Sequence, residues 1–163
     1  MSFINDWANG ECNKGKHALT EGKIAERAVA DHFKQLGHRV VHVSENEEQY
    51  NCGYDMTING NKTEIKSNDY IDDNGHMVVE VTDKTSNERP AKWKAAADRY
   101  IFVERQSGEA HVYDAKILAK ILDDNEKIPK WNRYERLKEG YYSGARCVHL
   151  PVNNKAKITE TKL

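Results

Sequence analysis

The chain is poor in cysteine and has no long apolar run, and each scarcity excludes a class of protein. Its three cysteines, Cys12, Cys52 and Cys147, lie far apart and form neither a disulfide framework nor a Cys-x-x-Cys pair. Such scattered thiols are typical of a reducing, intracellular setting. No apolar stretch approaches the roughly 18 residues that a membrane-spanning helix needs, and the first residues lack the basic and apolar segments of a secretory signal. We therefore expect no membrane segment.

Neither sign of charge dominates, because 25 Lys and Arg face 26 Asp and Glu. This balance excludes the uniformly basic coat of a histone-like protein, but it leaves room for a local basic face or for an acidic site that takes up metal cations. Repeats, low-complexity tracts and Pro/Ser-rich linkers are absent from the 163 residues, so we expect a single domain over residues 1–163. Residues 1–19 are polar and are expected to form a loose N-terminal arm.

The periodicity of the apolar residues predicts one long helix followed by a meander of strands. Thr20 is expected to cap a helix over residues 21–36 that ends at Gly37. Strands are predicted at residues 39–43, 53–58, 62–67, 77–81, 100–103, 111–113 and 147–150, and further helices at 90–97, 115–122 and 134–138. This order indicates an α/β or α+β fold with helices on the faces of a sheet.

A hairpin in the middle of the chain carries the residues with the clearest chemistry. Asn59-Gly60 is the strongest short signal for a type I′ turn. Counting outward from this turn places Asp55 directly opposite Glu64, with Cβ atoms roughly 4.5–5.5 Å apart on one face. Lys66 lies two residues beyond Glu64 and therefore shares that face.

Two adjacent carboxylates repel each other unless a cation lies between them. Lys66 is one candidate, and a metal ion such as Mg²⁺ or Mn²⁺, which prefers oxygen ligands, is another. A lysine beside such an ion can orient or deprotonate an attacking water, so the implied chemistry is phosphodiester hydrolysis. The alternative is a surface hairpin with an incidental Asp-Glu-Lys salt-bridge cluster. The apolar residues that alternate with Asp55 and Glu64 favour a site.

Glu26 is a second unusual carboxylate, because it lies in the middle of the apolar stripe of the first predicted helix. At about 100° per residue, Phe33 and Ala30 flank it on either side. An unpaired charge is costly there, which favours a role in a site. The alternative is a glutamate near the helix N-terminus that the helix dipole favours and that reaches solvent.

The spacing of Asp55, Glu64, Ile65 and Lys66 resembles the signature of the PD-(D/E)XK nuclease superfamily, in which an Asp and an (Asp/Glu)-x-Lys lie on adjacent strands of a hairpin. Residues 21–41 resemble the first helix and strand of that superfamily, as found in archaeal Holliday-junction resolvases and phage nucleases. The match covers about residues 20–103 in an αβββαβ order and leaves residues 104–163 as C-terminal additions. Tyr54 stands where the signature often has a proline.

The resemblance implies a restriction-endonuclease-like α/β fold and an Mg²⁺- or Mn²⁺-dependent DNA endonuclease, of the junction-resolvase, phage or repair type. Asp55, Glu64 and the backbone carbonyl of Ile65 would bind the metal, and Lys66 would act on the water. Glu26 would assist through a water on the metal or through a second ion. The expected partner is DNA, a homodimer is compatible with the family, and the expected location is the cytoplasm of a bacterium or of a phage-infected cell.

Two basic segments are candidates for holding DNA phosphates. The first is the stretch with Lys84, Arg89, Lys92, Trp93 and Lys94, and the second is the late helix with Arg133, Arg136 and Lys138. A packed tryptophan among solvated basic residues explains the first at least as well, and a solvated basic face explains the second equally well.

Two rival functions remain open at this stage. One is a catalytically silent DNA-binding or interaction module with the same fold. The other is a small-molecule hydrolase that uses the same acidic pair.

Overall fold

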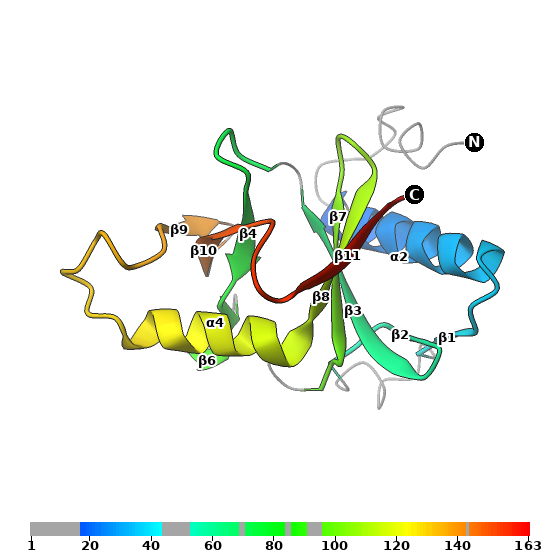
Figure 1. Cartoon of the computed structure of the whole chain (residues 1–163), viewed down its shortest axis with the longest axis horizontal. Helices are drawn as coiled ribbons and strands as arrows, with labels where there is room; N and C mark the ends of the chain where they lie inside the picture. The colour runs from blue at the N-terminus through cyan, green and yellow to red at the C-terminus, as the bar shows by residue number, and fades with distance from the viewer. Residues whose placement is uncertain (1–16, 44–52, 69–70, 84–85, 91–95, 143) are drawn as a thin grey trace.

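The computed structural model describes residues 17–43, 53–68, 71–83, 86–90, 96–142 and 144–163. Within these ranges it has two helices, α2 (His17–Gln35) and α4 (Ala115–Lys127), on opposite sides of a central sheet (Figure 1). Neither helix is long and apolar enough to cross a membrane. Most of the predicted N-terminal arm lies outside the described residues.

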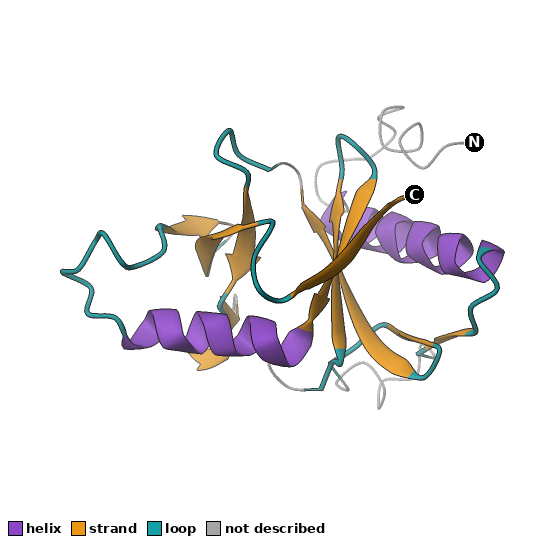
Figure 2. Cartoon of the chain, viewed as in Figure 1, coloured by secondary structure: helices purple, strands orange, loops and turns teal. Residues whose placement is uncertain are grey.

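The central sheet is mixed, and smaller sheets lie beside it (Figure 2). Its order is β1 (Val40–His42), β2 (Met56–Ile58), β3 (Asn61–Asn68), β7 (Arg99–Glu104), β8 (Glu109–Asp114) and β11 (Lys157–Lys162). Strands β3 and β7 are parallel, and the other neighbours are antiparallel. The second sheet has the order β4 (His76–Glu80), β10 (Ala145–Pro151) and β9 (Glu139–Tyr142), and β5 (Thr82–Asp83) pairs with β6 (Ser86–Pro90). The predicted α/β architecture is confirmed at this level.

Each face of the central sheet has its own hydrophobic core, because successive side chains of a strand point to opposite faces. On one face, Ile65 and Ile101 pack with Val29 of α2. On the other face, Phe102 packs with Leu118 of α4 and with the inner side of the second sheet. Glu64 and Lys66 alternate with Ile65, so they belong to the face that α4 covers.

The end of α2 agrees with the prediction, whereas its beginning does not. Gly37 has a φ of +86°, and the N–H of His38 donates to the Phe33 carbonyl oxygen at 2.9 Å. This left-handed glycine and its hydrogen bond end the helix as a Schellman motif. The helix begins at His17, upstream of the predicted cap Thr20, since residues 17–19 contain no helix breaker.

Two predicted helices are not found among the described residues, and one strand of the central sheet was not predicted. Residues 134–138 form turns instead of a helix. Pro90 is the last residue of β6 instead of the first of a helix, and residues 91–95 are not described. Strand β11 was not predicted, because as an edge strand its residues are mostly exposed and carry no apolar alternation.

The expected αβββαβ order is not reproduced among the described residues. The connection from β3 to its parallel partner β7 contains strands β4, β5 and β6, and the described part of it has no helix. Met77 and Val79 in this connection are buried with a period of two, which is typical of a strand. Helix α4, which covers the face of the central sheet that carries Phe102, follows β8 in the chain.

Candidate active site

The hairpin that carries the site has the predicted turn and register. Asn59 and Gly60 have positive φ angles of 49° and 82°, as a type I′ turn requires. Pairing proceeds outward from Ile58 opposite Asn61 to Met56 opposite Thr63. The register that the sequence predicts is therefore confirmed over the length of β2.

Asp55 lies just beyond the end of β2, where its side chain takes the place of a backbone carbonyl as a hydrogen-bond acceptor for β3. Its N–H donates to the carbonyl oxygen of Thr63 at 2.9 Å. The N–H of Ile65 then donates to Asp55 Oδ2 at 2.8 Å, where a continuing strand would have offered a carbonyl. Asp55 and Glu64 are thus not a ladder pair as predicted, but the β3 backbone holds the Asp55 carboxylate beside Glu64.

The two carboxyl groups form a buried, mutually perturbed pair. Burial raises the pKa of Asp55, while the hydrogen bond from Ile65 and the charge of Lys66 partly oppose this rise. Burial, and then the charge of Asp55, raise the pKa of Glu64 to about 7. A hydrogen bond from the Glu64 carboxyl group also opposes the rise in the pKa of Asp55, as expected of two acids that share a proton. Without a metal, the pair therefore retains a proton to higher pH than two isolated carboxyl groups would.

Lys66 supplies a cation at the edge of this pair. Its Nζ lies 3.2 Å from Glu64 Oε1. The side chain of Lys66 is 41% exposed, whereas that of Glu64 is only 11% exposed. The ammonium group therefore contacts the buried acid and remains accessible to a solvent-borne substrate.

Glu26 joins the same electrostatic cluster from α2. Burial, and then the charge of Asp55, raise its pKa to about 7, while Lys23 and Lys66 oppose the shift. Glu26 in turn contributes to the raised pKa of Glu64. The charges of the four side chains that the sequence singled out, from one helix and one hairpin, therefore act on one another.

Tyr100 forms a wall of the site that the sequence did not indicate. It pairs with Glu64 across the parallel β3–β7 contact and is fully buried. Burial, and then the charges of Glu64 and Asp55, raise its pKa, so its side chain lies close to both acids. Local patterns could not reveal it, because the pairing joins distant segments of the chain.

A groove beside Glu26 carries basic side chains that sequence reasoning also missed. It lies between α2 and β1 and is lined by Lys23, Glu26, Arg27, Ala30, Asp31, Lys34 and His42. Lys23, Arg27 and Lys34 are all exposed, and their spacing of four and seven residues places them on one face of the helix. Such a row suits a run of backbone phosphates.

The first basic segment proposed from the sequence lies almost entirely outside the described residues. Lys84, Lys92, Trp93 and Lys94 lie outside the described residues, and Arg89 lies in β6 with a side chain that is not described.

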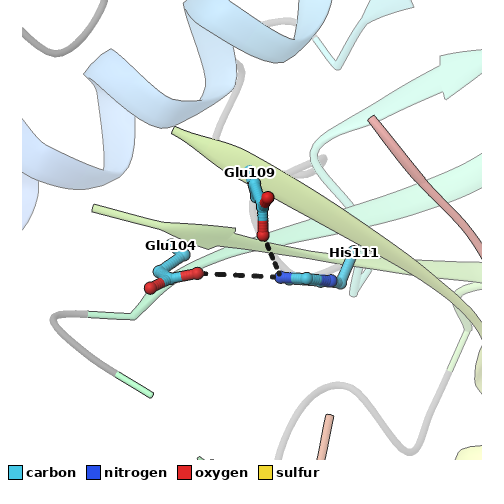
Figure 3. A group of neighbouring side chains, drawn as sticks. All are labelled: Glu104, Glu109 and His111. Carbon is cyan, nitrogen blue, oxygen red and sulfur yellow. Dashed lines mark ion pairs between the residues drawn. The ribbon is translucent and has the colours of Figure 1, made fainter. Parts of the chain in front are cut away.

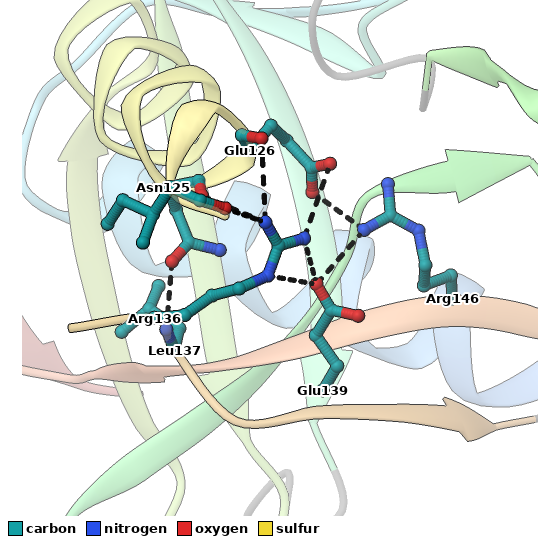
Figure 4. Close-up of polar contacts among 7 residues, drawn as sticks. Asn125, Glu126, Arg136, Leu137, Glu139 and Arg146 are labelled. Carbon is teal, nitrogen blue, oxygen red and sulfur yellow. Dashed lines mark hydrogen bonds and ion pairs between the residues drawn. The ribbon is translucent and has the colours of Figure 1, made fainter. Parts of the chain in front are cut away.

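Arg136 is only 7% exposed and is occupied in an internal network (Figure 4). It donates to the Ile128 carbonyl oxygen at 2.5 Å and pairs with Glu139 at 2.5 Å. Arg146 joins the network through Glu126 at 2.7 Å. Arg136 therefore anchors the turns after α4 and is not available to a phosphate.

No protein-family model matches the chain, and no curated protein matches it. Among solved structures, a bacterial homing endonuclease, I-Ssp6803I, is similar over 83% of this chain and 75% of its own, with 16% sequence identity and a TM-score of 0.46. A likeness this distant carries no argument about activity.

Proposed function

We propose that the chain is a metal-dependent deoxyribonuclease of the PD-(D/E)XK, restriction-endonuclease-like type, which hydrolyses phosphodiester bonds in DNA. The observation that carries the proposal is the buried Asp55–Glu64 carboxyl pair with Lys66 in contact at its edge. In a purely structural cluster, such charges would lie at the surface or be balanced one to one.

The donor set fits a hard divalent cation. Asp55 uses Oδ2 for the Ile65 N–H, which leaves Oδ1 for a metal. The N–H and carbonyl of a strand residue point toward the same neighbour, so the Ile65 carbonyl is directed toward the side where β2 has ended. Asp55, Glu64 and this carbonyl would hold Mg²⁺ or Mn²⁺. When bound, the ion would neutralise the two carboxylates and stabilise the charge that develops on the phosphate.

Lys66 and Glu26 supply the remaining functions. The exposed ammonium group of Lys66 orients the attacking water and offsets negative charge on the phosphate oxygens. The Glu26 carboxylate accepts a hydrogen bond from water on the α2 side of the pair and so positions it. The basic row of Lys23, Arg27 and Lys34 holds the DNA backbone next to Glu26.

The proposal is tested by a cleavage panel of single strands, duplexes, flaps and four-way junctions, with Mg²⁺, Mn²⁺, Ca²⁺ or EDTA. We expect cleavage with Mg²⁺ or Mn²⁺ and none with EDTA. Preference for a four-way junction would assign the resolvase-like class. DNA binding without cleavage of any substrate would overturn the proposal and favour a catalytically silent DNA-binding module.

A further inference from the structure

The turn that joins β7 to β8 carries a second group of potential ligands, away from the Asp55–Glu64 pair. Glu104 ends β7, Glu109 begins β8, and His111 lies two residues farther along β8 (Figure 3). One ligand atom from each residue lies within 4.8 Å of the other two. Because Glu109 and His111 are separated by two positions, they share the face of β8 that His111 presents to the core.

His111 is an unusual residue at the centre of this group. Its side chain is only 4% exposed, yet neither ring nitrogen has a hydrogen-bond partner within the described part of the chain. Buried polar atoms are normally paired, and an orphaned one points to a ligand.

The spacing of the carboxylates around His111 suits an ion better than a hydrogen bond. Nε2 lies 3.9 Å from Glu104 Oε2 and 3.8 Å from Glu109 Oε2, which is too long for a hydrogen bond. Two ligands at 2.0–2.1 Å around one tetrahedral zinc ion stand about 3.4 Å apart. Nε2 would therefore have to approach each carboxylate oxygen by about half an ångström, and the two carboxylate oxygens, which lie within 4.8 Å of each other, would close on the ion by a change of rotamer.

A third carboxylate lies on the other side of the imidazole. Glu160, the β11 partner of His111, places Oε2 3.4 Å from Nδ1. Lys157 holds that same oxygen at 2.6 Å. Histidines that ligate metals through one nitrogen usually donate the other N–H to a carboxylate, which fixes the ring and its tautomer.

We propose that Glu104, Glu109 and His111 bind a divalent transition-metal ion such as Zn²⁺, with Glu160 positioning the imidazole. One imidazole with two carboxylates suits zinc or a similar ion better than Mg²⁺, which prefers oxygen ligands alone. Glu109 is 47% exposed, so the ion can enter from solvent and retain water as a further ligand. The ion ties the β7–β8 hairpin together and, through Glu160, stiffens its contact with β11.

This site shares no residue with the Asp55–Glu64 pair but lies on the same face of the sheet. Lys66 pairs with Phe102, and Phe102 pairs with His111. Two strand spacings, roughly 10 Å, therefore separate Lys66 from His111.

The test uses the full chain with Asp55→Asn and Glu64→Gln, which removes the other acidic pair. Co²⁺ and Zn²⁺ are titrated, Co²⁺ by its visible absorption and Zn²⁺ by competition and by the change in melting temperature. We expect one equivalent to bind and the melting temperature to rise. Glu104→Gln and Glu109→Gln should each weaken binding at least tenfold, and Glu160→Gln should weaken it 10–100-fold.

Glu135→Gln, an exposed glutamate in the turns after α4, is the matched control and should bind as the parent does. Because Glu109 is largely exposed, its variant stays folded even if a His111 variant does not. Absence of saturable Co²⁺ and Zn²⁺ binding, or unchanged affinity in Glu104→Gln and Glu109→Gln, would overturn the proposal. Binding of Mg²⁺ with exclusion of Zn²⁺ would overturn the assignment to a transition metal.

Discussion

The carboxylate of Asp55 accepts the N–H of Ile65 at 2.8 Å, at the position where β2 leaves β3. This single contact fixes the acidic side chain to the backbone of the strand that carries Glu64 and Lys66. The geometry of the pair therefore depends on the end of a strand and not on a regular cross-strand contact. A glutamate at position 55 would be too long to make the same hydrogen bond with its carboxylate beside Glu64.

Replacing Lys66 should abolish most of the cleavage and leave binding intact. In Lys66→Ala, the group that orients water and offsets charge in the transition state is lost, so we expect kcat to fall by about 10²–10⁴-fold. DNA affinity and Mg²⁺ affinity should change little. Lys62→Ala, which removes an exposed lysine from the same strand, is the control and should cleave normally. Wild-type turnover in Lys66→Ala would rule out the proposed role.

Neutralising Asp55 should remove metal binding without loss of stability. Asn at this position keeps an oxygen for the Ile65 N–H but relieves the repulsion with Glu64, so the metal-free variant should melt at the wild-type temperature or slightly above it. Saturating Mg²⁺, at about 100 times its dissociation constant, should stabilise the wild type by about 2.7 kcal/mol and the variant not at all. Asp73→Asn, at an exposed position, should retain the full shift. A metal-free Asp55→Asn that melts several degrees lower would instead indicate a structural salt-bridge cluster.

The raised pKa of Glu64 predicts a specific dependence of stability on pH. Its pKa rises from 4.5 to about 7 on folding, so the folded state retains a proton that the unfolded chain releases between these values. The wild type should therefore lose stability relative to Glu64→Gln as pH rises from about 4.5 to 7, by at most about 3 kcal/mol. Below about pH 4.5 the two proteins should be equally stable. Urea unfolding at several pH values without metal measures this, and a difference that stays constant with pH would contradict it.

The basic groove should contribute affinity for DNA without sequence preference. Arg27→Ala combined with Lys34→Ala removes two exposed charges from the groove. Each lost phosphate contact should reduce the slope of log affinity against log salt by about 0.9. Binding titrations between low and moderate salt test this. The control combines Lys116→Ala with Lys130→Ala, which are exposed but lie outside the groove, and it should retain the wild-type slope.

Local signals in the sequence predicted the parts of the site that are local in the chain. Asn59 and Gly60 specify their turn through φ angles that few other residues adopt, and this turn sets the register of the hairpin. Gly37 specifies the end of α2 for the same reason. These residues therefore predict the hairpin that carries Glu64 and the end of the helix that carries Glu26, but not the place of Asp55 beyond the end of β2.

The remaining features depend on contacts between distant segments. Tyr100 faces the acidic pair only because β7 runs parallel to β3, and a parallel pairing leaves no signal in a short window of sequence. The surroundings of His111 likewise depend on a distant segment, because β11 places Glu160 beside it. The composition of residues 134–138 predicts a helix, since residues such as Arg136 are ordinary helix formers. In the structure, the ion pairs of Arg136 with Glu126 and Glu139 hold this segment in turns instead.

Glu26 offers the most demanding test, because its carboxylate reaches the site from a separate element. Glu26→Gln keeps the shape and removes a charge that burial and Asp55 both disfavour, so the variant should be as stable as the wild type or more stable. The loss of a group that positions water should nevertheless slow cleavage by about 10²–10⁴-fold. The matched control is Asp31→Asn, which neutralises another carboxylate that lines the same groove and should leave the rate at saturating DNA unchanged. Thermal melts and single-turnover cleavage with Mn²⁺ measure the two effects separately. A normal rate in Glu26→Gln would reduce the active site to Asp55, Glu64 and Lys66 and leave the helix carboxylate with no part in the chemistry.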